Sequence, residues 1–168
     1  MAAPFIQTFQ SLFGNWQQSK SCSDDFTFIF ALQGVIQIVR KAAITAHIKI
    51  TPPDKQHVQV AQTATSGKIP STTKQYTLDC ESHNNKDAVF GEISGRSRWV
   101  RVEDAEEPKV VTKGGGAWIE QENVAWEAHH LSDFEQVTDE KRQTRRVYVK
   151  NSKAEELRVG IGFDFLGK

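Results

Sequence analysis

Alternation of apolar and polar residues dominates the chain after residue 45, and it predicts short β-strands. In the clearest segment, 156–166, apolar residues occupy every second position from Leu157 to Phe165. Residues two apart share one face of a strand, so this segment offers an apolar face to a core. Related patterns between turn residues predict further strands over 47–51, 57–64, 73–80, 88–93, 97–103, 117–121, 124–131 and 144–150.

Near the start of the chain the apolar spacing is helical. Residues 5–13 place four apolar side chains on one helical face and predict a short amphipathic helix. A polar strand over 14–21 follows. Ser23 then has the character of an N-cap, and two short helices are expected as far as residue 43. Gly34 separates them, because an interior glycine costs a helix roughly 1 kcal/mol relative to alanine.

These elements predict about ten strands, with the helical pair between the first and the second. Strands spaced this closely favour an all-β barrel or sandwich over alternating strand–helix units. The sequence contains no repeat, low-complexity tract or linker that would divide it. We therefore expect a single domain over residues 1–168.

Composition narrows the possible partners. Lys+Arg and Asp+Glu both number 21, which gives a formal net charge of zero and argues against a nucleic-acid partner. No apolar run approaches the ~20 residues that span a bilayer, so stable membrane insertion is not expected. The N-terminus has no secretory signal pattern. Cys22 and Cys80 are expected to be free thiols, and the cytoplasm is the expected location.

Several motifs resemble those of the intracellular lipid-binding proteins, the fatty-acid-binding family of the calycin superfamily. That family begins with a Gly-x-Trp strand, inserts a helix-turn-helix and continues as a ten-stranded up-and-down barrel. The matching segments here occur in the family's order at nearly its spacing: Phe13-Gly14-Asn15-Trp16, Asp24-Asp25-Phe26, Ala31-Leu32-Gln33-Gly34-Val35, Arg40-Lys41-Ala42 and Ser71-Thr72-Thr73-Lys74-Gln75-Tyr76-Thr77-Leu78.

The resemblance implies a ten-stranded antiparallel calycin barrel whose cavity binds a small, largely apolar molecule. The ligand would be fatty-acid-like, or terpenoid- or polyketide-like, and no cofactor is expected. The helical pair would form a lid over the opening, with Phe30 among the side chains that face the ligand. The chain is longer than a typical member, which keeps an alternative open: a cofactor-independent isomerase or cyclase of secondary metabolism that uses the same cavity.

Arg146 and Tyr148 are the first candidates for ligand contact. They share one face of a predicted strand, and a guanidinium with a phenol can hold a carboxylate. The family uses an Arg-x-Tyr pair in this way on its final strand, whereas this pair lies on the penultimate one. The alternative is an Arg/Tyr pair on the outer wall, with Val147 and Val149 alternating between and beside them.

Tryptophans supply further candidates for the cavity wall. Trp99 and Arg101 share a face of one strand, where they could meet a polar ligand group or form a surface cation–π pair. Trp118 and Trp126 could line the cavity or belong to a packed core.

Acid–base and metal chemistry have little support in the sequence. Glu127 and His129 share a strand face, as a general base and its orienting partner could, but such pairs are usually solvated. Adjacent His129 and His130 point to opposite faces of a strand and cannot chelate one ion together. Neither Cys-x-x-Cys nor His-Glu-x-x-His occurs, so no metal is expected.

Overall fold

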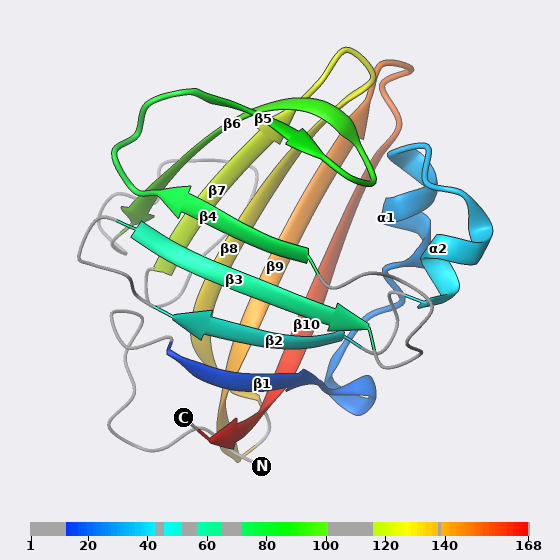
Figure 1. Ribbon diagram of the computed structural model, residues 1–168. Coiled ribbons are helices and arrows are strands. Elements are labelled where there is room, and N and C mark those ends of the chain that lie inside the picture. Colours follow the sequence, from blue (N-terminus) through cyan, green and yellow to red (C-terminus); the bar gives the residue numbers. More distant parts are fainter. Residues whose placement is uncertain are drawn as a thin grey trace.

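The computed structural model describes residues 13–42, 46–51, 57–64, 72–100, 116–137 and 139–167 of the chain. The strands of these residues form one antiparallel sheet of ten, ordered β4-β3-β2-β1-β10-β9-β8-β7-β6-β5. The sheet curves so strongly that its strands surround an interior (Figure 1). The predicted ten-stranded up-and-down barrel is therefore confirmed.

The strands differ in length around the barrel. The shorter ones are β1 (Gly14–Gln18), β2 (Ala46–Thr51), β3 (His57–Ala64), β4 (Thr72–Thr77), β5 (His83–Asp87) and β7 (Gly116–Glu122). The longer ones are β6 (Gly91–Val100), β8 (Trp126–Val137), β9 (Glu140–Asn151) and β10 (Glu156–Gly167). The sequence underestimated the lengths of β8 and β9. These strands pair along their whole length, from Trp126 opposite Asn151 to Val137 opposite Glu140.

One predicted strand was wrong. Residues 88–93 were expected to form a strand, but the chain turns between Asp87 and Gly91, where β5 ends and β6 begins. The Asp87 carboxylate accepts hydrogen bonds from the backbone N–H groups of Val89 and Phe90, at 2.7 and 3.0 Å. A short acidic side chain that bonds the backbone two or three residues ahead stabilises a turn, and this local bond outweighs the apolar pattern.

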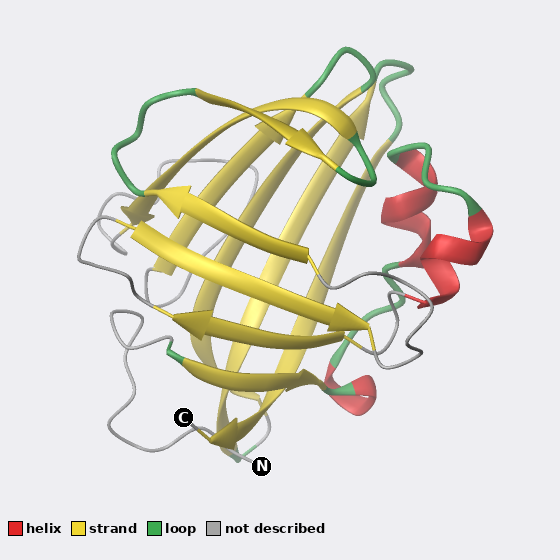
Figure 2. Cartoon of the chain, viewed as in Figure 1, coloured by secondary structure: helices red, strands yellow, loops and turns green. Residues whose placement is uncertain are grey.

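The two predicted helices form between β1 and β2. They are α1 (Thr27–Leu32) and α2 (Gln37–Ala42), and they lie together beside the barrel (Figure 2). Gly34 separates them with a φ of +78°, a conformation that glycine adopts without steric cost. Of the helix predicted over residues 5–13, only Phe13 lies within the described part of the chain.

Ser23 does not cap α1 as predicted. The N-cap position is Phe26, whereas the Ser23 hydroxyl accepts a hydrogen bond from Gly162 N–H at 3.0 Å. The Asp24 carboxylate likewise accepts a hydrogen bond from Gly160 N–H, at 2.7 Å. The segment before α1 is therefore hydrogen-bonded to the part of β10 that precedes its pairing with β1, which begins at Phe163. A Cβ on Gly162 would lie 2.6 Å from the Cys22 carbonyl oxygen, so only glycine allows this approach.

Among the described strands, the sheet does not close by pairing of its two end strands. β4 and β5 are the ends of the sheet order, and the close approach across this opening is between β4 and β6. Cys22 and Cys80 are both free thiols. Within the described part of the chain, none of the helices has the length and apolar character needed to cross a membrane.

Candidate functional site

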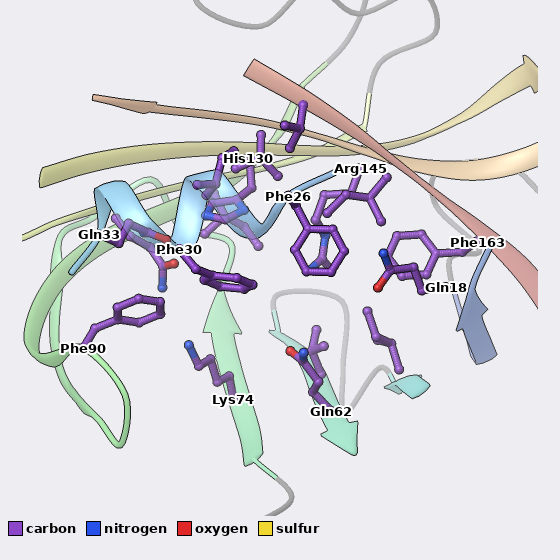
Figure 3. Close-up of a pocket in the computed structure, with 18 of the residues that line it drawn as sticks. Gln18, Phe26, Phe30, Gln33, Gln62, Lys74, Phe90, His130, Arg145 and Phe163 are labelled. Carbon is purple, nitrogen blue, oxygen red and sulfur yellow. The ribbon is translucent and has the colours of Figure 1, made fainter. Parts of the chain in front are cut away.

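A cavity lies inside the barrel beneath α1. It contains about 140 Å³ of space open to the centres of water molecules. Figure 3 shows Phe26, which precedes α1, and Phe30, which lies within α1. Both face strand residues on the opposite wall, among them Gln62 and Lys74. The enclosing wall therefore combines helix and strand side chains, and aromatic rings cover the helical side.

Apolar residues gather at two ends of this interior. One core cluster lies near the start of β1 and the end of β10: Trp16, Ile48, Ile50, Val58, Phe134 and Phe163. The other lies beneath α1: Ile29, Ile93, Trp126, Ala128, Val147 and Val149. On β8, Phe134 of the first cluster and Trp126 of the second lie toward opposite ends of the inward face, and His130 and Ser132 lie between them. Polar side chains therefore face the interior between them.

Arg145 is the central polar group of the cavity. It lies on β9 two residues before Val147, so both side chains face inward. Its Nε donates to the Ser132 hydroxyl at 3.4 Å, and its guanidinium lies 5.7 Å from the centre of the Phe163 ring. Among the described residues, no acidic side chain forms an ion pair with it. Burial in this setting lowers the pKa of Arg145, although the group stays charged.

His130 is the inward neighbour of Arg145 on β8. It pairs with Val147, and Ser132 pairs with Arg145, so the two side chains are diagonal neighbours. Burial lowers the pKa of His130 to about 3, and the charges of Arg145 and Lys74 add to this effect. Its Nε2 atom is buried without a hydrogen-bond partner among the described residues. His130 is therefore a neutral imidazole at physiological pH.

Lys74 brings a second cation to the cavity wall. Its ammonium forms an ion pair with Asp87 and lies 5.8 Å from the centre of the Phe90 ring. The contact joins β4 to the β5–β6 turn. Lys74 is thus already neutralised by the protein, which distinguishes it from Arg145.

The remaining polar groups of the wall are neutral. They are one phenol and four amides: Tyr76, Gln18, Gln33, Gln62 and Gln121. Such groups can hydrogen-bond a ligand or water without adding charge. The interior therefore has two cations, one of which is paired with a carboxylate, and a ring of neutral hydrogen-bonding groups.

The predicted Arg146–Tyr148 contact with the ligand is contradicted by the register of β9. Arg145 and Val147 line the cavity, so Arg146 and Tyr148 face outward. The Tyr148 hydroxyl donates to the Glu156 carboxylate at 2.7 Å, and the Arg158 guanidinium lies 5.2 Å from the centre of its ring. Burial and the nearby Glu156 raise the pKa of Tyr148 to about 12. Arg146 and Tyr148 therefore form the alternative that the sequence left open, an Arg/Tyr pair on the outer wall.

Glu127 and His129 also lie on the outer face. They alternate with Trp126 and Ala128, whose side chains belong to the core. His129 Nδ1 is 3.5 Å from the Glu120 carboxylate, and its ring centre is 5.8 Å from that of Tyr148. The proposed acid–base pair therefore faces away from the cavity.

The aromatic candidates divide between cavity and core. Phe30 lines the cavity as predicted. Trp126 is buried in the cluster beneath α1, and Trp99 packs against the cluster at the other end. Arg101 lies outside the described residues. Trp118 is placed on β7 opposite Leu131, but its side chain is not among those described.

Sequence reasoning missed Arg145 and His130, although a signal for both was present. Val147 and Val149 mark the buried face of β9, and Arg145 has the same parity. Trp126 and Ala128 mark the buried face of β8 in the same way, and His130 follows them. Apolar neighbours two residues away identify the inward face more reliably than the spacing of an Arg-x-Tyr pair.

Comparisons with solved structures agree with this architecture. Fatty-acid-binding protein 1 from Echinococcus granulosus superposes with a TM-score of 0.61 at 14% identity, over 93% of this chain and 98% of that one. The wild-type fluorescent protein UnaG gives a TM-score of 0.60 at 11% identity, over 92% and 96% of the two chains. Neither a protein-family model nor a curated protein sequence matches the chain. At sequence identities this low, the superpositions establish the fold alone.

Proposed function

Because this chain has the fold of a fatty-acid-binding protein, we propose that it binds a small, largely apolar molecule that carries one anionic group. The ligand occupies the central cavity, and Arg145 holds its anionic group. One observation carries the proposal: the Arg145 guanidinium faces the cavity, and no described acidic side chain pairs with it. A guanidinium enclosed in the barrel without an acidic partner carries a desolvation cost, and a ligand anion would offset that cost.

The apolar clusters support the same assignment. Arg145 lies between them, so an anionic group at this point leaves apolar wall for the rest of the ligand. Phe26, Ile29 and Phe30 of the α1 region cover that wall on one side. Most of the binding free energy would then come from apolar burial, and Arg145 would select for charge.

The isomerase or cyclase alternative would need a proton donor or acceptor that faces the cavity. Glu127 and His129 face away from it, and the inward His130, with its pKa lowered to about 3, is a weak base. The Lys74 ammonium is held in an ion pair with Asp87, which leaves the Tyr76 phenol as the candidate proton donor. A binding protein needs only the enclosed space and the guanidinium. Binding without chemical change is therefore the function that we propose.

Substitution of Arg145 tests this function. Arg145→Met should weaken the binding of lauric acid by roughly 2–4 kcal/mol, the range for losing a charge-assisted pair. Dodecanol, which has the same chain and no charge, should lose much less. Affinities can be measured by displacement of a fluorescent apolar probe.

Arg146→Met is the matched control, since it removes the same side chain from the opposite face of β9. It should leave the affinity for both ligands unchanged. If Arg145→Met binds lauric acid as tightly as the parent protein does, Arg145 does not anchor the ligand and the proposal fails.

A further inference from the structure

A second pocket opens where the sheet is not continuous. β4 and β5 are the two ends of the sheet order, and they diverge in Figure 1. Between β4 and the β5–β7 region lies a space of about 130 Å³ open to the centres of water molecules. We call it the lateral pocket and define it by Tyr76, Asn85, Gly95, Ser97 and Gln121.

The lateral pocket adjoins the central cavity. Tyr76, Ile119 and Gln121 line both spaces. The partition between them is therefore made partly of side chains, which can change rotamer. A ligand in the cavity could extend past Tyr76 and Gln121 without breaking backbone hydrogen bonds.

Small residues on β6 create the space. The inward face of β6 runs Ile93, Gly95, Ser97 and Trp99, so two small residues stand between two large ones. A Cβ on Gly95 would lie 2.8 Å from the carbonyl oxygen of Glu120, because β6 and β7 approach closely here. The backbone thus excludes a larger residue at position 95 and keeps the pocket open.

The chemistry of the lateral pocket is neutral and polar. Its charged rim residues are already paired, since His83 lies 2.9 Å from the Asp79 carboxylate and Arg96 forms an ion pair with Glu120. The neutral polar groups that line it include the Tyr76 phenol, the Ser97 hydroxyl and the amides of Asn85 and Gln121. These groups offer both hydrogen-bond donors and acceptors.

We propose that the lateral pocket binds a hydroxyl, carbonyl or amide group at the far end of the ligand whose anionic group Arg145 holds. This inference rests on the proposed function and narrows its ligand class to bifunctional chains, acidic at one end and neutral polar at the other. Arg145 pairs with Ser132, which pairs with Ala117, four residues before Gln121. The spacings of strands and residues in a sheet put the two sites roughly 16 Å apart along the wall.

The test compares lauric acid with ω-hydroxylauric acid, which differ only in a terminal hydroxyl. Titration calorimetry of the full chain should show the hydroxy acid binding roughly 3–10-fold more tightly, as one additional hydrogen bond would give. If the chain end lay against an apolar wall, the hydroxyl would instead weaken binding about tenfold or more.

Two variants locate the effect. Gln121→Leu should abolish the preference for the hydroxy acid, and Ser97→Val should do the same by filling the pocket without removing the amide. Gln17→Leu is the matched control on an exposed residue of β1 and should keep the preference. Circular dichroism of each variant checks that the barrel still forms.

The outcomes separate the two proposals. If lauric acid binds in an Arg145-dependent way but is preferred over the hydroxy acid, the lateral pocket is not a ligand site and the proposed function stands. A preference for the hydroxy acid that survives both pocket variants also overturns this inference. If neither acid depends on Arg145, the proposed function fails and the inference fails with it.

Discussion

The two faces of the β8–β9 hairpin carry the same kinds of residue in opposite surroundings. Outside, His129 lies next to the Glu120 carboxylate and Tyr148 donates to Glu156. Inside, His130 and Arg145 are diagonal neighbours without an acidic side chain paired to either among the described residues. On the outer face the protein supplies its own partners. On the inner face Arg145 has no acidic partner among the described residues, and we propose that a ligand anion fills that role.

The pH dependence of stability should give the largest difference between the two faces. Because the folded-state pKa of His130 is lowered to about 3, the unfolded chain binds a proton that the folded chain does not between about pH 6.5 and pH 3. The contribution of His130 to stability is therefore complete above pH 6.5 and is lost as the pH falls. By pH 4.5 the loss should reach about 3 kcal/mol.

Urea denaturation at several pH values measures this loss. In His130→Gln the dependence assigned to His130 should disappear, whereas His129→Gln should retain it. Parallel pH profiles for the parent and His130→Gln would show that His130 does not supply the difference.

The second-largest effect should be a change in the stability of the ligand-free protein when Arg145 is replaced. Arg145→Leu removes a buried guanidinium without an acidic partner, so it should raise the free energy of unfolding by about 1–2 kcal/mol in the absence of ligand. Arg146→Leu acts on the outward face and should not stabilise. Chemical denaturation of both variants provides the comparison. A destabilised Arg145→Leu would mean that the guanidinium is well compensated inside the empty barrel.

The smallest effect should come from the outer hydrogen bond. Tyr148→Phe removes the hydroxyl that donates to Glu156 and should cost about 1 kcal/mol of stability. Lauric acid affinity should be unchanged, because Tyr148 does not face the cavity. Impaired binding in this variant would contradict the outward orientation of the ring.

Tyrosine ionisation offers a spectroscopic check on the same residue. The chain has two tyrosines, Tyr76 and Tyr148, so ultraviolet titration can assign both by difference. The pKa of Tyr148, raised to about 12, should produce a late phase that is absent from Tyr148→Phe.

Local pattern was sufficient for most of the architecture. Alternation along β10 and the helical spacing around Phe26–Phe30 both predicted the observed elements. Gly34 marked the break between α1 and α2, because a positive φ there favours glycine. The Gly14-Asn15-Trp16 start also indicated the fold, since Trp16 is fully buried in the core. Such features depend on neighbours in sequence, which is why they can be read before the fold is known.

The site depended on a choice that local pattern left open. Arg145-Arg146 and His129-His130 each offer one residue to either face, and a shift of one residue reverses the inside and outside of a strand. Only the pairing of β8 with β9, and the closure of the barrel around them, assigned Arg145 and His130 to the cavity. The lateral pocket was harder still to predict from the sequence. It lies between β4 and the β6–β7 pair, and among the described strands β4 is not paired with either of these two.

The sequence by itself therefore determined the elements, their order and the amphipathic character of each strand, because those follow from local side-chain periodicity. The tertiary structure decided which face of each strand encloses the cavity and which polar groups meet there. That decision is physical: burial of the apolar face fixes the register of the whole strand, and the polar residues of the same parity are carried inside with it.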